Sequence, residues 1–352
     1  MKSPAGILVI HTAFIGDVIL VLPLLQGLRE LFPAARIGLV SVPASAGVLA
    51  NHPAVDRIHL YAKRGADRGL RGFLRLAREI RSEHYALALV PHRSLRSAGL
   101  AWWARIPRRV GFDTSAGRML FSEVVPYRKE HHEIQRNLSL LSPLGLAPPA
   151  AQLPRVHPSE EDHRRVTALL QDHGKVGAPG GRMIALAPGS VWLTKRWPRE
   201  HFEELARKLI SEGWTVLLVG GEADKDLCTV ITQNVPSDRL ISAAGHLSLL
   251  QSAALLERCD VVVSNDSAPM HLATAVGTPV IGIFGATTPS FGFAPIGPSD
   301  RTLGLDSLSC RPCAIHGGPR CPIGTFECMW GITPTQVYHS IQEILHGTPR
   351  NS

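Results

Sequence analysis

The sequence lacks several features that would identify a function at once. It has no uninterrupted apolar run of about 18 residues, so we expect no membrane-spanning helix. The apolar run at the N-terminus is too short for a signal peptide, which predicts a cytoplasmic protein. No GxxxxGK[ST] motif follows any predicted strand, and the first predicted strand–helix turn has no GxGxxG, which argues against a P-loop nucleotidase.

Composition indicates a folded α/β protein with an uneven charge. The 352 residues are 45% apolar and 19% charged, enough for about two domains with separate cores. Residues 1–150 carry 20 Lys/Arg and 10 Asp/Glu, a net charge of +10, whereas residues 151–352 carry 17 and 19, a net charge of −2. The first half therefore predicts an anionic partner, although a solvated Arg-rich surface is an equal alternative. No zinc-finger, RNP-type or basic-region motif is present, so we expect no nucleic-acid partner.

Short apolar runs alternate with amphipathic stretches along most of the chain. This alternation predicts doubly wound parallel sheets in two Rossmann-like domains. A proline- and glycine-rich stretch at 146–182 interrupts this alternation of strands and helices, which predicts a linker between the two domains. We therefore expect a first domain at 1–160, a second domain at 180–333, and a last segment, 334–352, whose helix can cross back to the first domain.

The stretch from Val261 to Pro289 has the clearest pattern. Two β-branched runs flank a polar turn and a short helical stretch that Gly277 ends, which predicts a βαβ unit with buried parallel strands. Asp266 and Ser267 then lie at the carboxyl end of a strand, where open sheets bind ligands. Either residue can cap the helix, and the free N–H groups there can bind phosphate. A plain helix cap is the competing interpretation of Asp266.

Three further turns after predicted strands carry polar side chains. Gly16-Asp17 follows the first strand, Lys195 lies in the long loop 188–198, and Glu222 follows a Gly-Gly turn. Lys195 can neutralise a phosphate, and Glu222 can accept two ribose hydroxyls; a solvated lysine and a charge at a helix start are the alternatives. His271, one turn into the helix after Ser267, is either packed or a second phosphate donor.

Four of the six cysteines lie close together near the C-terminus: Cys310, Cys313, Cys321 and Cys328. A CxxC pair followed by two more cysteines is typical of a tetrahedral metal site, and the surrounding prolines and glycines supply little core. We expect that the segment can hold one Zn or Fe ion. Such an ion would be structural and not catalytic, because four thiolate ligands leave no open coordination position. The spacing of the second pair is not CxxC, and small buried cysteines are the alternative.

Together these motifs, in this order, resemble the family-nine glycosyltransferases, which include the ADP-heptose:lipopolysaccharide heptosyltransferases. The resemblance rests on Gly16-Asp17, the 188–198 block with its Lys-Arg-Trp-Pro, Gly220-Gly-Glu222, Ser264–His271 and Phe284–Pro289. The Lys-Arg-Trp-Pro block and the cysteine-rich segment are more similar to heptosyltransferase II than to heptosyltransferase I. The resemblance implies a GT-B fold with a cleft between the domains, an ADP-heptose donor held by the second domain and a lipid A–core acceptor held by the first.

The resemblance also implies roles for single residues. Asp17 would be the catalytic base of an inverting transfer, and no metal would be required at the reaction centre. The residues implied for the donor are Ser190 and Lys195 at the diphosphate, Glu222 at the ribose, Asp266 at the heptose, and Ser267, Ala268 and His271 around the phosphates. We expect such an enzyme to be peripheral at the inner face of the inner membrane, on an anionic lipid surface. The alternatives are a heptosyltransferase for a protein or another glycan and a non-catalytic nucleotide-sugar-binding protein.

Overall fold

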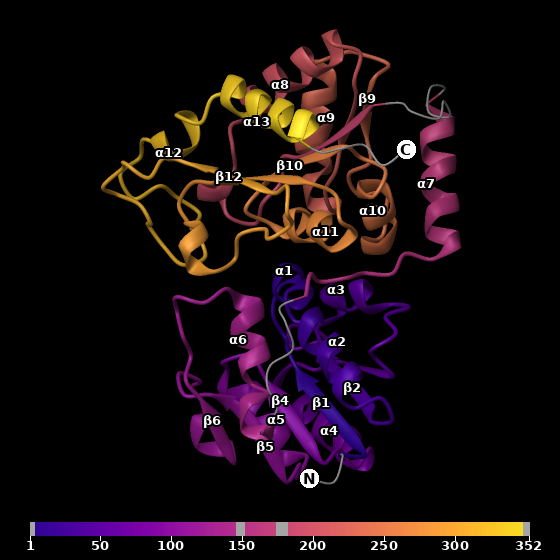
Figure 1. The fold of residues 1–352 in the computed structure, drawn as a ribbon, viewed down its shortest axis with the longest axis vertical. Helices are drawn as coiled ribbons and strands as arrows, with labels where there is room; N and C mark the ends of the chain where they lie inside the picture. The colour runs from indigo at the N-terminus through magenta and orange to yellow at the C-terminus, as the bar shows by residue number, and fades with distance from the viewer. Residues whose placement is uncertain (1–3, 146–151, 174–181, 348–352) are drawn as a thin grey trace. The chain divides into compact units, whose positions relative to one another are not determined.

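The computed structural model describes residues 4–145, 152–173 and 182–347. The chain divides into two compact units, Met1–His157 and Pro158–Ser352, each with its own parallel sheet (Figure 1). No helix in the described part of the chain is long and apolar enough to cross a membrane.

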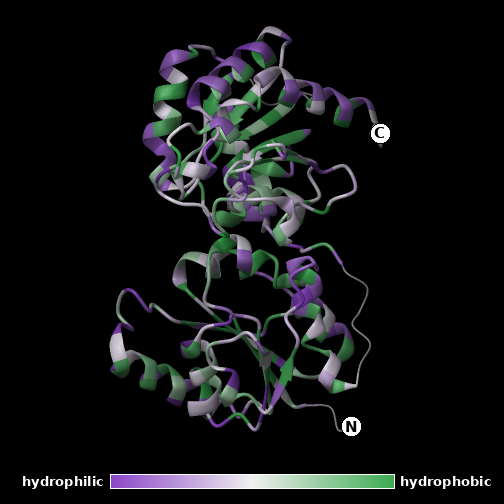
Figure 2. Ribbon diagram, turned by 90° about the vertical axis from the view of Figure 1, so that its left-hand side faces the viewer, coloured by the Kyte–Doolittle hydropathy of each residue, from purple (hydrophilic) through white to green (hydrophobic). Residues whose placement is uncertain are grey.

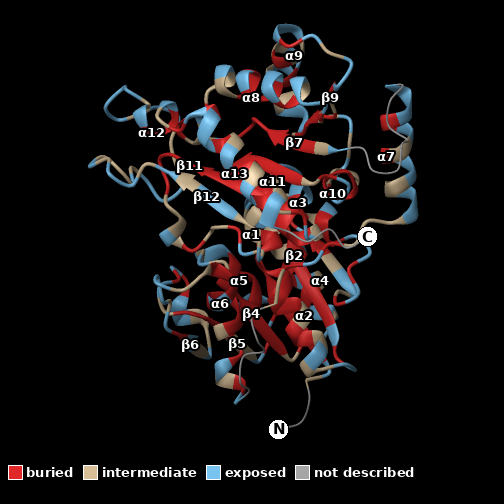
Figure 3. Ribbon diagram, turned by 45° about the horizontal axis from the view of Figure 1, so that its top comes forward, coloured by how far each residue is buried: buried red, intermediate tan, exposed pale blue. Residues whose placement is uncertain are grey.

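The first unit contains a six-stranded parallel sheet in the order β3-β2-β1-β4-β5-β6. Its strands are β1 (Gly6–Ile10), β2 (Arg36–Ser41), β3 (Arg57–Leu60), β4 (Leu87–Val90), β5 (Arg108–Phe112) and β6 (Glu123–Val125). Its helices are α1 (Ile15–Ile19), α2 (Leu22–Leu31), α3 (Pro43–Ala46), α4 (Gly69–Ser82), α5 (Leu95–Trp103) and α6 (Glu133–Ser139), with 3₁₀ turns η1 (Gly47–Leu49), η2 (Arg118–Leu120) and η3 (Ser142–Leu144). The central strands are apolar along their whole length because helices cover both faces of a parallel sheet (Figure 3).

The second unit repeats this architecture, with strand order β12-β11-β10-β7-β8-β9. Its strands are β7 (Met183–Ala187), β8 (Thr215–Leu218), β9 (Leu240–Ser242), β10 (Val261–Asn265), β11 (Val280–Phe284) and β12 (Arg301–Gly304). Its helices are α7 (Glu160–Asp172), α8 (Arg199–Ser211), α9 (Lys225–Asn234), α10 (Leu249–Leu256), α11 (Ala268–Val276), α12 (Glu327–Trp330) and α13 (Pro334–Gly347), with 3₁₀ turns η4 (Leu193–Lys195), η5 (Glu222–Asp224) and η6 (Pro289–Phe291). Figure 2 shows that the strands of both sheets are mostly hydrophobic and that the helices carry both hydrophobic and polar residues.

Two helices at the edges of the second unit have clear partners. Helix α7 lies within the stretch expected as a linker, yet it packs against α10 of the second unit. Helix α13 packs against α8, β10 and β11 and shares their apolar core in the second unit. The short strands β9 and β12 had no predicted counterpart in the sequence, because neither has a long apolar run.

A hydrogen-bonded chain of three side chains links β3, α4 and the segment before β4 in the first unit. Tyr85 Oη lies 3.0 Å from His59 Nε2, and His59 Nδ1 lies 2.7 Å from Glu79 Oε1. Burial raises the pKa of Tyr85 to about 12, so its hydroxyl stays protonated. Gly38 on β2 leaves room for this ring, since a Cβ there would lie 2.2 Å from Tyr85 Oη.

We predict that Gly38→Ala lowers the free energy of unfolding by about 1–3 kcal/mol, because the added methyl group displaces a buried ring and breaks its hydrogen bond. Urea denaturation followed by circular dichroism measures this loss. Gly65→Ala is the matched control, because a Cβ at Gly65 meets nothing closer than 3.7 Å. Equal losses in the two variants would contradict the prediction.

Candidate functional site

An ion pair joins two loops at the carboxyl edge of the second sheet. Lys195 Nζ lies 2.7 Å from Asp266 Oδ2, and the two side chains are only 14% and 9% exposed. Lys195 lies in the 188–198 loop after β7, and Asp266 directly follows β10, the neighbouring strand. Parallel pairing of these strands therefore brings together two residues that lie 71 positions apart in the sequence.

A third loop holds the carboxylate of this pair. Thr287, after β11, donates its hydroxyl hydrogen to Asp266 Oδ2 over 2.7 Å. The backbone N–H of Asp266 donates to the carbonyl of Ile283, which fixes the residue against β11. Sequence analysis did not single out Thr287; the hydroxyl-rich turn Phe284–Pro289 was the available signal.

Asn265 fixes the loop that carries Lys195. This last residue of β10 is fully buried, and its Nδ2 donates to the carbonyl of Pro188 over 2.9 Å. Its Oδ1 accepts the N–H of Trp197 over 2.9 Å. One amide therefore binds both ends of the 188–198 loop. Sequence analysis did not identify this role either, and a polar residue at the end of a buried strand was the only signal.

The cysteine-rich segment, residues 310–328, is hydrogen-bonded to the same 188–198 loop. Gly318 N donates to Thr194 Oγ1 over 2.8 Å, and Thr194 N donates back to the carbonyl of Gly318 over 3.2 Å. Arg311, with a side chain that is 4% exposed, donates to the carbonyls of Phe284 and Thr287 over 3.0 Å each. The segment thus braces the residue before Lys195 and the turn that carries Thr287.

The start of α11 lies directly beside the ion pair in the sequence and has no side-chain cap. Ser267 is the N-cap residue, but its hydroxyl makes no capping hydrogen bond and lies 3.4 Å from the carbonyl of Gly189. The prediction that Ser267 or Asp266 caps this helix is therefore wrong, because both side chains are bonded elsewhere. A helix start without a cap offers backbone N–H groups and the positive end of the helix dipole to an anion.

The remaining predicted donor residues occupy the same unit in different environments. Ser190 is buried, and its carbonyl accepts Arg196 Nε over 2.8 Å. His271 is buried one turn into α11. Glu222 is exposed and pairs with Lys225 at 3.0 Å. Glu222 also lies next to the loop after β9, since a Cβ at Gly245 would be 2.8 Å from its carboxylate.

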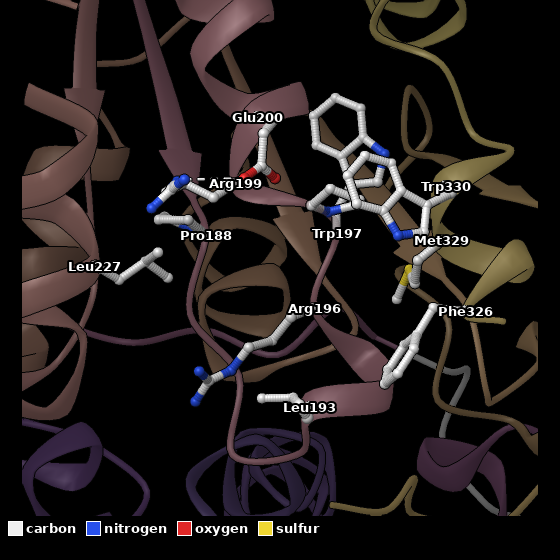
Figure 4. A pocket seen from close by; sticks show the side chains of 11 residues that line it. Pro188, Leu193, Arg196, Trp197, Arg199, Glu200, Leu227, Phe326, Met329 and Trp330 are labelled. Carbon is white, nitrogen blue, oxygen red and sulfur yellow. Dashed lines mark hydrogen bonds and ion pairs between the residues drawn. The ribbon is translucent and has the colours of Figure 1, made fainter. Parts of the chain in front are cut away.

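An apolar cavity of about 210 Å³ lies along another side of the 188–198 loop. Figure 4 shows its aromatic lining, which includes Trp197, Phe326 and Trp330. The ring of His201 contacts both tryptophans edge to face, with centroids 5.2 Å from Trp197 and 5.1 Å from Trp330. None of the predicted donor residues lines this cavity, so it is separate from the ion pair.

Asp17 belongs to the first unit and lies in the first turn of α1. Its Oδ2 accepts the N–H of Phe14 over 3.2 Å, half of a capping box, and the residue is partly exposed. His11 and His92 lie at the carboxyl ends of β1 and β4. Burial lowers the pKa of His11 to about 3 and that of His92 to about 4. Both imidazoles are therefore neutral at neutral pH.

The four clustered cysteines are free thiols. Burial raises the pKa of Cys328 to about 11, whereas backbone N–H groups lower the pKa of Cys321. In the ranges that the structure describes, no three His, Cys, Asp or Glu side chains are grouped to hold a metal ion. The metal site thus stays a prediction from the cysteine spacing.

Comparison with known proteins identifies the family. A family model described as glycosyltransferase family 9 (heptosyltransferase) matches residues 73–318. The chain is 30% identical to lipooligosaccharide heptosyltransferase 2 of Haemophilus influenzae, over 97% of this chain and 99% of the relative.

Solved structures share the fold over almost the whole chain. A family-9 glycosyl transferase from Veillonella parvula superposes with a TM-score of 0.88 at 24% identity, covering 98% of each chain. ADP-heptose LPS heptosyltransferase II of Escherichia coli gives a TM-score of 0.79 at 24% identity, covering 97% of this chain and 99% of that one. The predicted GT-B architecture is confirmed, and the chain belongs to glycosyltransferase family 9, the heptosyltransferase family.

Proposed function

We propose that this glycosyltransferase moves heptose from ADP-heptose to the inner core of lipopolysaccharide, as its relatives named heptosyltransferase 2 do. One observation carries the proposal on the donor side. A nearly buried Lys195–Asp266 pair lies next to the uncapped start of α11, so one site offers a cation, helix N–H groups and a carboxylate. A nucleotide diphosphate sugar needs the first two for its phosphates and the third for its sugar hydroxyls.

In the proposed reaction, the second unit stabilises the leaving group. The C–O bond between heptose and the β-phosphate breaks, and negative charge develops on ADP. Lys195 and the first N–H groups of α11 receive that charge, with Ser190, Ser267, Ala268 and His271 around the phosphates. Asp266 accepts hydroxyl groups of the heptose, and Glu222 accepts those of the adenosine ribose. These protein groups supply the charge stabilisation without a metal at the reaction centre.

In the proposed reaction, the first unit supplies the base. The Asp17 carboxylate takes the proton of the acceptor hydroxyl as the acceptor oxygen attacks the anomeric carbon. The N–H of Phe14 holds one carboxylate oxygen and so fixes its direction. Attack on the face opposite the leaving ADP inverts the anomeric centre, through a transition state with oxocarbenium character.

Donor and acceptor can be tested separately. Thermal unfolding is followed with ADP-heptose, ADP-glucose and UDP-glucose, since a ligand that binds the folded state raises the melting temperature by mass action. Transfer to truncated lipid A–core is then measured by mass spectrometry. Stabilisation by ADP-heptose without transfer to this acceptor would redirect the proposal to a protein or another glycan. The absence of stabilisation by any of the three donors would overturn it.

We predict that Asp17→Asn lowers kcat by roughly 10²–10⁴-fold, because the amide cannot take a proton, while the melting-temperature shift with ADP-heptose stays near that of the wild type. Asp162→Asn is the matched control. Asp162 holds the same capping-box position in α7, where it accepts the N–H of Ser159 over 2.8 Å. Wild-type turnover in Asp17→Asn would place the base elsewhere.

We predict that Lys195→Ala and Asp266→Ala each reduce kcat/KM for ADP-heptose by roughly 10²-fold or more, because each removes a charged group at the reacting end of the donor. Steady-state kinetics and ADP titration measure the two effects. Lys208→Ala removes a lysine that pairs with Glu212 at 3.3 Å on the surface of α8, and it serves as the control. Normal ADP affinity and turnover in both site variants would show that the donor binds elsewhere.

We predict that the four-cysteine segment binds about one Zn or Fe ion per chain, as tetrahedral thiolate sites do. Metal analysis of protein purified without chelators or a metal-affinity tag measures the content. Cys310→Ser/Cys313→Ser should lose the metal, whereas Cys259→Ser, outside the segment, should keep it. A metal-free protein that is stable and active would end this proposal.

We also propose that the protein is peripheral at the cytoplasmic face of the inner membrane. The support is the net charge of +10 on residues 1–150, which attracts an anionic lipid surface at a distance of up to about one Debye length. A lipid-linked acceptor lies on such a surface.

A further inference from the structure

Helix α5 of the first unit ends in two exposed tryptophans. Trp102 is 48% exposed and Trp103 is 51% exposed, and their rings meet edge to face with centroids 5.6 Å apart. Indole rings are usually covered in a folded protein, because each carries a large apolar area. Two adjacent exposed rings on one helix therefore indicate a surface that is covered by something else.

Other exposed apolar side chains lie along the same helix. Leu95, 58% exposed, precedes Trp102 by seven residues and so shares its face of α5. The 3₁₀ turn η2 packs against α5 and carries Met119, which is 86% exposed. Added to Trp102 and Trp103, these residues form what we call the α5 face: Leu95, Trp102, Trp103 and Met119.

Helix α4 extends this surface. The two helices are in contact, and a Cβ placed at Gly99 would lie 3.4 Å from the ring of Phe73. Leu70 lies one turn before Phe73 and is 69% exposed. The apolar surface thus continues from α5 towards the start of α4.

The exposed charges without an ion-pair partner on α4, α5 and η2 are arginines. Among the described residues of α4, α5, η2 and the turn after α5, six exposed arginines make no ion pair: Arg71, Arg78, Arg81, Arg96, Arg105 and Arg118. The carboxylates of the α4 region are bound to other partners. Glu79 pairs with His59 at 2.7 Å, and Glu83 pairs with Arg36 at 2.6 Å.

We propose that the α5 face is the surface by which this protein lies on an anionic lipid bilayer, an inference that rests on the proposed function at a membrane. Tryptophan and leucine side chains enter the boundary between headgroups and acyl chains, and arginines around them bind lipid phosphates. A nucleic acid would use the arginines and leave Leu95 and Met119 exposed. A second copy of the chain would bring two sets of unpaired arginines together.

The test compares vesicle binding of four proteins: the wild type, Trp102→Ser/Trp103→Ser, Leu95→Ser/Met119→Ser and Trp330→Ser. Trp330 is a matched control, since it is 50% exposed but lies on α12 of the second unit. Co-sedimentation uses vesicles of phosphatidylglycerol and phosphatidylcholine, or phosphatidylcholine alone, at low and high salt. Quenching of tryptophan fluorescence by brominated lipid shows whether the rings enter the bilayer.

We expect the wild type to bind the anionic vesicles, with affinity that falls steeply with salt. Both double variants should bind at least roughly tenfold more weakly, since each loses the apolar area that inserts, and Trp330→Ser should bind as the wild type does. Quenching should disappear in Trp102→Ser/Trp103→Ser. Wild-type binding by the double variants, or no binding of the wild type to anionic vesicles at low salt, would overturn the proposal.

Two further measurements show whether a failed test concerns the α5 face, the proposed heptose transfer or self-association of the chain. Heptose transfer to a truncated acceptor in detergent should be the same in all four proteins, so its absence in the wild type is a failure of the proposed function and not of the surface. Light scattering gives the oligomeric state. A wild-type oligomer that Trp102→Ser/Trp103→Ser converts to monomers, without any change in vesicle binding, would show that the α5 face is a contact between copies and would overturn the lipid assignment.

Discussion

The ion pair between Lys195 and Asp266 is the contact at which the loops after β7 and β10 of the second unit meet. Both side chains are nearly buried, and an ion removed from water needs a partner and further hydrogen bonds. Thr287 supplies one of these bonds to Asp266. A buried pair of this kind stabilises a fold little compared with an apolar contact, which is consistent with the proposed role of the pair in donor binding. Losing either partner leaves an uncompensated charge in a nearly buried position, which destabilises the loops locally.

The geometry of this pair comes from segments that are distant in the sequence. Asn265 binds both ends of the 188–198 loop, Gly318 bonds to Thr194, and Arg311 binds the carbonyls around Thr287. The 310–324 segment contains few core residues but many of these hydrogen bonds. Its contribution is thus to position the residues around the ion pair, and this contribution exists whether or not its cysteines hold a metal.

The sequence predicted the architecture well, because alternating buried strands and amphipathic helices leave few other folds. It predicted Lys195 and Asp266 as separate candidates, but only the pairing of β7 with β10 shows that they meet. Asn265 and Thr287 act through hydrogen bonds across the sheet, and the local signals, a polar strand end and a hydroxyl-rich turn, do not show which partners they bind. The expected cap at Ser267 failed for the same reason, since its hydroxyl lies against Gly189 and not against its own helix. Strands β9 and β12 are too short for periodicity to reveal.

The two halves of the chain differ in net charge and therefore in how each would bind an anionic partner. The second half of the chain has a net charge of −2, although the proposed donor carries a diphosphate. Its recognition of phosphate would therefore be local, through one lysine and the N–H groups of one helix, which act only at contact distance in a site shielded from water. The first half, at +10, has its unpaired arginines on the surface, where their field extends over a Debye length and falls with salt. Charge that is spread over a surface cannot select one small ligand, but it suits an extended anionic partner.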